Sequence, residues 1–447
     1  GLLSRAGATV IVNPSASNDV IGKRQYRRDL VKMQSGRCRC AYVYASCGAG
    51  ESSTDLVFSG HCMIAENGKM IKETENVMEN EEMIIGDCRY RKNASTTEEK
   101  FNSDVWADIP DIMETPIFTS GWPQILPEKV EAYPFVPGDN ITRSARCEEI
   151  LNMQAKGLIQ RLRATDIKDV VLGLSGGLDS TLALIVCCRA FDYLEIDHKN
   201  IHCVSMPGFG TSGKTKEISR KLAEEFGVSF KEIDIKKSCS THMKDIGHKA
   251  DVYDVAYENI QARERTQVLF DLSNMLNALV IGTGDMSELA LGWCTYNGDH
   301  MSNYAVNVGV PKTLVKWIVK YYAEVTRSKV LNDVFELPIS PELLPTDKDG
   351  EISQKTEESI GKYDLHDFFL YHFLRNGFGS VKIQKLAEIA FPQIGADEIA
   401  KTLQIFYQRF RTQQFKRSCI PDGVKIGSVA LSPRGDLRLP SDLTTMY

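Results

Sequence analysis

The chain has 447 residues, a formal net charge of −6 and a hydrophobic content of 43%. This length allows two or three domains, and the apolar content is enough to fill their cores, which excludes a largely disordered chain. Acidic and basic residues are well mixed, so no basic surface for nucleic acid is predicted, and the longest apolar run, residues 182–188, is too short to span a bilayer.

The twelve cysteines are scattered along the chain. The spacing of Cys38 and Cys40 and the adjacent pair Cys187 and Cys188 fit neither a usual zinc site nor a disulfide framework. Reduced thiols in a cytoplasmic enzyme are the simplest interpretation.

Residues 1–92 are predicted to be β-rich with one helix. The pattern predicts a strand over 8–12, a basic helix over 26–38, a strand over 41–45, and a strand over 57–64 that enters a hairpin turn at Glu66-Asn67-Gly68. Residues 93–140 are richer in charge, proline and glycine, and we expect them to form a connector on the surface.

From residue 141 onward, helical and strand patterns alternate. The pattern predicts helices over 147–162, 178–191, 214–226 and 257–276, and strands over 169–174, 201–206, 229–235 and 278–282. This alternation is typical of an α/β fold with a doubly wound parallel sheet, which binds ligands at the carboxyl ends of its strands. The last hundred residues are predicted to be mainly helical.

The first strand of this region runs into a glycine-rich turn that opens a helix. The turn reads Gly173, Leu174, Ser175, Gly176, Gly177, Leu178, Asp179, Ser180. Two glycines let the backbone turn tightly and present N–H groups to an anion, and the helix N-terminus adds positive potential. We therefore expect a phosphate or pyrophosphate cradle. The Walker lysine is absent, and the loop resembles the pyrophosphate loop of ATP pyrophosphatases.

A second phosphate motif, residues 208–215, fits the Walker A pattern letter for letter and includes Lys214. One interpretation is a Walker-type NTPase. The other is a loop near the adenosine of an ATP molecule held by the Ser-Gly-Gly turn on the neighbouring strand. We favour the second, because no apolar strand ending in a clear Walker B acid follows, unless Asp285 serves after two glycines.

A third segment, residues 282–293, reads Gly-Thr-Gly-Asp-Met-Ser-Glu-Leu-Ala-Leu-Gly-Trp. Glu288 would lie in the first turn of a helix, where an acid suits the helix dipole or faces a cleft as a metal or ligand contact. Lys312 would start a further helix, where a lysine opposes the dipole. It is therefore either a solvated surface residue or a contact for a bound anion.

Together these segments resemble the NAD synthetase family. The resemblance rests on Ser175–Ser180 and on residues 207–212, 257–263, 282–296 and 309–313. Residues 415–418 and 431–436 resemble the glutamine-dependent, two-domain form of the family. The block over 282–293 narrows the substrate to deamido-NAD. The implied fold over residues 141–447 is that of the ATP pyrophosphatases and related adenine-nucleotide hydrolases.

The resemblance implies an ATP- and Mg²⁺-dependent amidation of deamido-NAD by ammonia or glutamine in a homo-oligomer. The implied catalytic residues are Asp179, Glu288 and Lys312, of which Asp179 and Glu288 would hold the metal. Thr283 joins the Ser-Gly-Gly turn in contacting ATP. The residues implied to contact deamido-NAD are Asn259, Glu288, Trp293 and Lys416. Two alternatives stay open, namely a GMP synthetase-like amidotransferase and a non-catalytic nucleotide-binding subunit.

Residues 1–92 resemble the C-terminal half of an αββα nitrilase-like glutaminase domain. The resemblance rests on residues 7–10, 42–45 and 50–55. Such domains hydrolyse glutamine with a Glu–Lys–Cys set, and in the family all three precede the strand that ends here at Asn13. We therefore expect no glutaminase nucleophile in this chain and expect it to use free ammonia.

Four cysteines of this region could in principle substitute for the missing nucleophile, namely Cys38, Cys40, Cys47 and Cys62. None is predicted to sit at a strand-to-helix elbow beside a base, so we interpret them as structural. Half of such a domain would expose apolar strand faces, and we expect it to aggregate or to associate with another chain through residues 1–92.

Overall fold

The computed structural model describes residues 4, 8–48, 56–74, 83–86, 88, 130–249, 251–337, 343–344 and 356–443. The chain divides into two compact units, one of Gly1–Glu51 with Phe58–Glu128 and one of Ser52–Val57 with Lys129–Tyr447. Most of the expected connector and the segment 50–55 lie outside the described residues. Among the described residues, no helix is both long and apolar enough to span a membrane.

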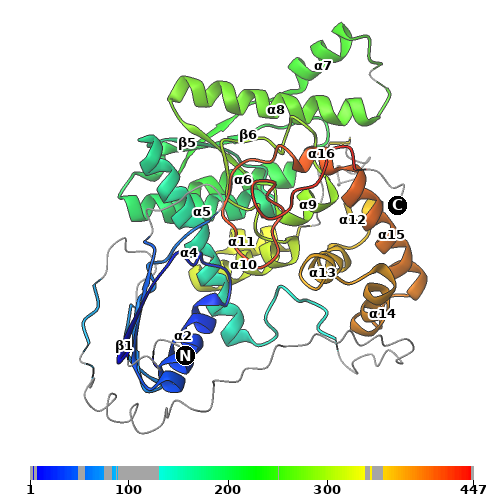
Figure 1. Cartoon of the computed structure of the whole chain (residues 1–447). Coiled ribbons are helices and arrows are strands. Elements are labelled where there is room, and N and C mark those ends of the chain that lie inside the picture. The colour runs from blue at the N-terminus through cyan, green and yellow to red at the C-terminus, as the bar shows by residue number, and fades with distance from the viewer. Residues whose placement is uncertain are drawn as a thin grey trace. The chain divides into compact units, whose positions relative to one another are not determined.

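The first unit contains a four-stranded mixed sheet with one helix packed on it (Figure 1). Its elements are β1 (Val10–Ser15), α2 (Lys23–Cys38), β2 (Ala41–Ser46), β3 (Met63–Glu66) and β4 (Lys69–Glu73). β1 pairs with β2 in parallel, whereas β3 is antiparallel to both of its neighbours. The helix buries Val31 against Tyr44 and Met63, which forms the core of this unit.

Two predictions for the first unit differ in detail from the structure. The strand predicted over 57–64 begins only at Met63, although the hairpin turn is confirmed, since Asn67 and Gly68 have φ values of 51° and 81°. The strand predicted over 8–12 runs from Val10 to Ser15 and includes Pro14. Proline is tolerated there because β1 lies at the edge of the sheet.

The second unit is built on a five-stranded parallel sheet in the order β7-β6-β5-β8-β9. Its strands are β5 (Val170–Gly173), β6 (Ile201–Ser205), β7 (Ser229–Glu232), β8 (Leu279–Gly282) and β9 (Tyr304–Ala305). The helices that connect and cover them are α4 (Asn140–Thr165), α5 (Leu178–Leu194), α6 (Gly213–Glu225), α7 (Lys236–Asp245), α8 (Val255–Leu276), α9 (Met286–Leu291), α10 (Lys312–Thr326) and α11 (Lys329–Phe335). The predicted doubly wound α/β fold is confirmed.

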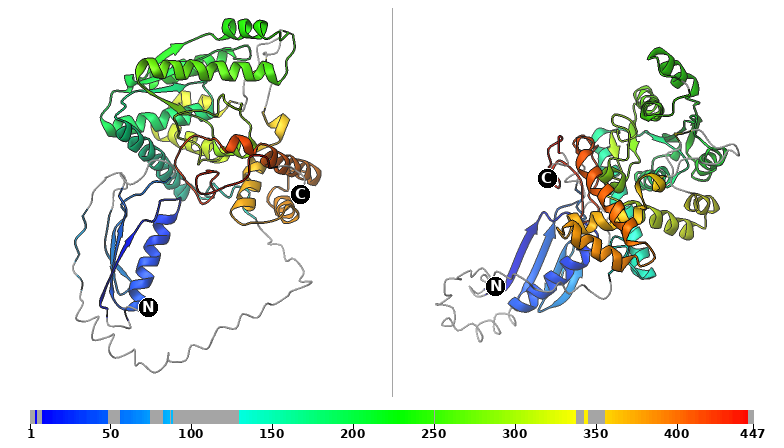
Figure 2. Two further views of the ribbon diagram at one scale, coloured as in Figure 1. Left: turned by 45° about the horizontal axis from the view of Figure 1, so that its top comes forward. Right: turned by 90° about the vertical axis from the view of Figure 1, so that its right-hand side faces the viewer.

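The chain leaves the central strand β5 in one direction and later returns to its other side. It passes from β5 through α5 to β6, whereas β8 pairs with β5 on the opposite edge. Figures 1 and 2 show α8 along one face of the sheet, with α5 and α6 on the other. The carboxyl ends of β5 and β8 therefore flank a topological switch point, where such folds place their ligands.

Five further helices follow in the described part of the chain, namely α12 (Thr356–Ile360), α13 (Tyr363–Leu374), α14 (Ser380–Ala390), α15 (Ala396–Thr412) and α16 (Gln414–Arg417). Three of them, α13, α15 and α16, pack against α9 beside the switch point. Phe368, Phe369 and Phe406 form their apolar core. Helix α13 packs against both α9 and α10, so side chains of its first two turns reach the helices that follow the switch point.

Candidate active site

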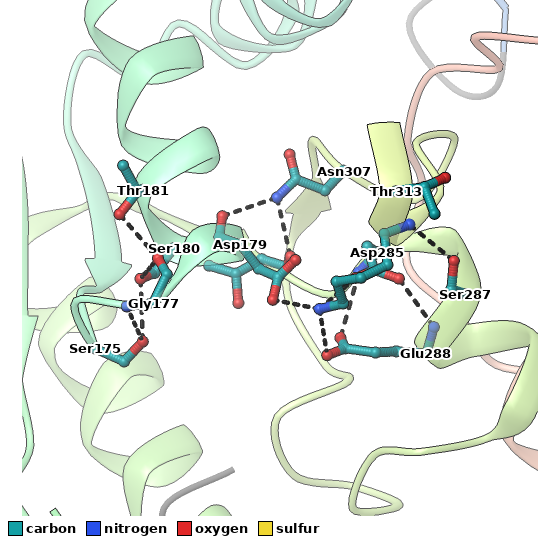
Figure 3. Close-up of polar contacts among 12 residues, drawn as sticks. Ser175, Gly177, Asp179, Ser180, Thr181, Asp285, Ser287, Glu288, Asn307 and Thr313 are labelled. Carbon is teal, nitrogen blue, oxygen red and sulfur yellow. Dashed lines mark hydrogen bonds and ion pairs between the residues drawn. The ribbon is translucent and has the colours of Figure 1, made fainter. Parts of the chain in front are cut away.

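The Ser-Gly-Gly turn is a tight loop that requires glycine at its centre. Gly176 has a φ of 84°, and a Cβ added there would lie 2.6 Å from the carbonyl oxygen of Thr215. The Ser175 hydroxyl accepts a hydrogen bond from the Gly177 N–H at 3.2 Å and lies 3.1 Å from the Ser180 hydroxyl (Figure 3). The turn therefore packs closely on the first turn of α6.

Helices α5, α6 and α9 each begin at this edge of the sheet, and their first turns differ in capping. At α6, the Ser212 side chain accepts a hydrogen bond from the Thr215 N–H, and at α9 the Asp285 side chain accepts one from the Glu288 N–H. Helix α5 begins after Gly177, where no side chain caps the first turn. Of these three helix starts, α5 is the one whose N–H groups are left for an external anion.

Four charged side chains meet beside the start of α5. The Lys312 Nζ lies 2.6 Å from an oxygen of Asp179, 2.6 Å from one of Asp285 and 2.9 Å from one of Glu288. Figure 3 shows the three acids pointing toward one another from α5 and from the start of α9. Lys312 is 2% exposed and Asp285 is fully buried. We call these four residues the acid–lysine cluster.

Burial and mutual charge oppose each other in this cluster. Burial raises the pKa of Asp285 well above its ordinary value and that of Glu288 to about 7, while the Lys312 ammonium acts in the other direction. Burial alone would lower the pKa of Lys312, but Asp179, Asp285 and Glu288 together hold it well above the usual value. Lys312 is therefore a permanent positive charge in the site.

The three acids also fit a divalent cation. One oxygen from each of Asp179, Asp285 and Glu288 lies within 4.8 Å of the others. The buried Oδ1 of Asp179 has no hydrogen-bond partner within the described part of the chain. Carboxylate oxygens with spare lone pairs are the ligands that Mg²⁺ prefers. The predicted pair Asp179 and Glu288 is thus brought together, and Asp285, considered from the sequence only as a possible Walker B acid, joins them.

Asn307 is a further residue that sequence reasoning missed. Its side-chain amide donates to the carbonyl oxygens of Asp179 at 2.9 Å and Thr283 at 3.0 Å, as Figure 3 shows for Asp179. Gln154 in turn donates to the Asn307 side-chain oxygen at 3.0 Å. Asn307 therefore ties the turn after β5 to the turn after β8. No local pattern marks it, because both partners are distant in sequence.

The residues expected to contact deamido-NAD gather around the segment that follows α9. The Lys416 Nζ donates to the carbonyl oxygens of Gly292 at 2.8 Å and Cys294 at 2.6 Å. The Asn259 side chain accepts from the Thr295 hydroxyl at 2.8 Å. The backbone N–H of Trp293 donates to the Glu288 carbonyl oxygen at 2.9 Å, so Trp293 directly follows the end of α9.

The Walker-like loop lies beside the Ser-Gly-Gly turn, since Gly176 abuts Thr215. Its lysine, Lys214, is exposed, and the start of its helix is already capped by Ser212. The Phe209 N–H donates to Gln261 on α8 at 3.0 Å. This arrangement favours the interpretation of a flanking loop over that of a Walker site.

The cysteines considered as substitute nucleophiles include two that are fully enclosed. Cys38 and Cys40 are buried, and burial together with the neighbouring Cys38 raises the pKa of Cys40 to about 11. A thiol with such a pKa is a poor nucleophile near neutral pH. The geometry therefore agrees with a structural role for this pair.

Comparisons with known proteins all identify NAD synthetases as similar to this chain. The family model described as NAD synthase matches residues 150–418. The glutamine-dependent NAD(+) synthetase of Mycobacterium leprae is 41% identical over 98% of this chain and 70% of its own length, and that of Mycobacterium tuberculosis is 40% identical over the same shares. The crystal structure of a glutamine-dependent NAD(+) synthetase from Cytophaga hutchinsonii has a TM-score of 0.73 at 20% identity, covering 99% of this chain and 70% of that one, which is a likeness of fold.

Proposed function

This chain belongs to the glutamine-dependent NAD(+) synthetase family, and on that premise we propose that it joins ammonia to the nicotinate carboxylate of deamido-NAD, with the acid–lysine cluster as the reaction site. The family match is to NAD synthase over residues 150–418, so the GMP synthetase-like alternative is set aside. The observation that carries the proposal is the acid–lysine cluster at the switch point, directly beside the uncapped start of α5.

The first step activates the carboxylate. A carboxylate is a poor electrophile, so one of its oxygens attacks the α-phosphorus of ATP, and pyrophosphate leaves to give an acyl-adenylate. Negative charge builds up on the leaving pyrophosphate. We assign the stabilisation of that charge to the N–H groups at the uncapped start of α5 and to the Lys312 ammonium beside them.

The acids of the cluster suit the metal that the family implies. Asp179 and Glu288, with Asp285 beside them, would hold Mg²⁺, which when bound screens phosphate charge and polarises phosphoryl oxygens. Asn307 keeps the backbone of Asp179 in register with that of Thr283, the residue expected to contact ATP.

The second step forms the amide. Ammonia attacks the acyl carbon, AMP leaves with the electron pair of the broken carbon–oxygen bond, and a proton is lost from nitrogen. No covalent bond to the protein is needed, which agrees with a site built from charges and backbone donors. We assign the binding of deamido-NAD to Asn259, Trp293 and Lys416, as the family resemblance implies, and the hydrogen bonds of Asn259 and Lys416 to the segment that follows α9 support this assignment.

Incubation with ATP, Mg²⁺, deamido-NAD and ammonium tests this proposal. NAD, AMP and pyrophosphate should appear in equal amounts, and exchange of pyrophosphate into ATP should require deamido-NAD. Binding of ATP without either reaction would instead identify a non-catalytic nucleotide-binding subunit.

The proposal also specifies the nitrogen donor that this 447-residue chain uses. Glutamine hydrolysis needs a nucleophile and a base, and the family's Glu–Lys–Cys set has no assigned counterpart here. We expect ammonium to support NAD synthesis and glutamine to yield no glutamate. Glutamate release that disappears on mutating Cys47 or Cys62 would contradict this. We also expect a homo-oligomer, which light scattering would measure.

A further inference from the structure

Tyr363, the first residue of α13, carries a buried hydroxyl group that the protein leaves unpaired. The residue is 2% exposed, and its hydroxyl oxygen has no hydrogen-bond partner within the described part of the chain. Most buried hydroxyl groups are paired, because an unpaired one loses its hydrogen bonds to water without replacement. A phenylalanine would fill nearly the same volume without this loss. The hydroxyl group therefore needs an explanation beyond packing.

This tyrosine lies against the acid–lysine cluster. The Lys312 Nζ is 5.3 Å from the centre of the Tyr363 ring. Burial raises the pKa of the Tyr363 hydroxyl well above its ordinary value, and the acids of the cluster raise it further against the opposing effect of Lys312. The hydroxyl therefore keeps its proton at neutral pH and is available as a hydrogen-bond donor.

Asp367, one turn further along α13, fixes where Tyr363 lies. One Asp367 oxygen accepts hydrogen bonds from the Thr313 N–H at 2.9 Å and the Thr313 hydroxyl at 2.6 Å, and the other accepts from the Ser287 hydroxyl. These contacts hold the start of α13 against the starts of α9 and α10. The Tyr363 ring is thus placed by a rigid framework, and its hydroxyl is not free to seek a distant partner.

Each acid of the cluster places an oxygen on Lys312, and the Tyr363 hydroxyl makes no hydrogen bond to any of them. We propose that the Tyr363 hydroxyl is a hydrogen-bond donor reserved for bound nucleotide, and that its acceptor is a phosphoryl oxygen. This inference rests on the proposed function, because that function brings phosphate groups to Lys312. An O–H donor beside an ammonium group suits an anionic oxygen.

The substitution Tyr363→Phe in the full chain tests this inference. We expect kcat/KM for ATP to fall by on the order of tenfold, as the loss of one hydrogen bond to a charged group predicts. The thermal unfolding midpoint without ligand should stay the same or rise, because an unpaired buried hydroxyl is removed. The rise in that midpoint on adding Mg²⁺ and ATP, without deamido-NAD, should be smaller than in the wild type.

Tyr371→Phe on the same helix is the matched control. Its ring contacts Phe135, away from the acid–lysine cluster, so kinetics and the ATP-induced shift should match the wild type. Unchanged kinetics and an unchanged ATP-induced shift in Tyr363→Phe would overturn the inference. A parallel loss of ligand-free stability and activity would also overturn it, in favour of a structural role. An inactive wild type would instead refute the proposed function.

Discussion

At the scale of single residues, the two lysines at helix starts lie in opposite surroundings. Lys312 is buried among three carboxylates at the switch point, whereas Lys214 is exposed on α6 in a motif that matches the Walker pattern. A charge contributes most to catalysis where water is excluded and its position is fixed. The Walker motif alone would assign the larger contribution to catalysis to Lys214, whereas burial and fixed charge contacts assign it to Lys312.

Lys312→Ala should lower kcat by on the order of a hundredfold or more, because it removes the positive charge that we propose stabilises the departing pyrophosphate. Lys214→Ala is the matched control, and its kcat should stay within about twofold of the wild type, since removing a solvated charge changes little. Steady-state NAD synthesis under saturating ATP measures both. A larger loss in Lys214→Ala would favour the Walker interpretation.

Residues with local signals were found from the sequence, and residues defined by distant contacts were not. Local sequence was enough to single out Asp179, Glu288 and Lys312, because each follows a strand or opens a helix. The structure brings all three together. Asn307 and Asp367 act on partners far away in the chain, and an isolated polar residue gives no sign of such pairing. The roles proposed for Asn259, Trp293 and Lys416 stay predictions.

At the scale of elements, the start of α10 has no capping side chain of its own. Pro311 precedes it, and Asp367 of α13 and Ser287 of α9 accept the N–H groups of its first two residues. Capping by neighbouring helices fixes the three helices relative to one another. Because Lys312 and Glu288 lie in the first turns of α10 and α9, the same contacts determine how these two side chains meet.

Asp367→Ala should therefore lower kcat by about tenfold or more, as misplacement of a catalytic group does, with little change in the KM for ammonium. Asp367→Asn should lose less, because its amide oxygen still accepts from Thr313. Asp364→Asn makes the same chemical change on α13 at a residue that pairs with Tyr133, and it serves as the control. If Asp367→Ala and Asp364→Asn had equal kcat values, the capping contacts would not position the site.

At the scale of the whole molecule, the alternation of strands and helices was enough to predict the parallel sheet. It was not enough to predict the sheet's last strand, one of the helices, or where one strand ends. Helix α7 and the two-residue strand β9 were missed. The strand predicted to end at Ile235 stops at Glu232. Each of these depends on packing or pairing with distant segments. A strand as short as β9 pairs only because β8 is already in place.

We expect His366, in the aromatic core of the C-terminal helices, to make the stability of the second unit depend on pH. His366 is buried there, with its Nε2 2.8 Å from the Ile360 carbonyl oxygen, and burial lowers its pKa from 6.5 to about 4. The unfolded chain binds a proton at His366 near pH 6.5, whereas the folded chain does so only near pH 4. Stability should therefore be complete above pH 6.5 and fall as pH decreases toward 4, by up to about 1.4 kcal/mol per pH unit from this group.

His366→Gln should flatten this dependence, because a glutamine amide can still donate toward Ile360 but does not titrate. Urea unfolding followed by tryptophan fluorescence at several pH values between 7.5 and 4.5 measures the effect. We expect the difference in unfolding free energy between wild type and variant to be constant above neutrality and to change in favour of the variant as pH falls below about 6.5. His242→Gln, at an exposed position on α7, should keep the wild-type slope. If the His366→Gln and His242→Gln slopes were the same, the acid sensitivity would have to come from other groups, such as His372, whose pKa burial also lowers to about 4.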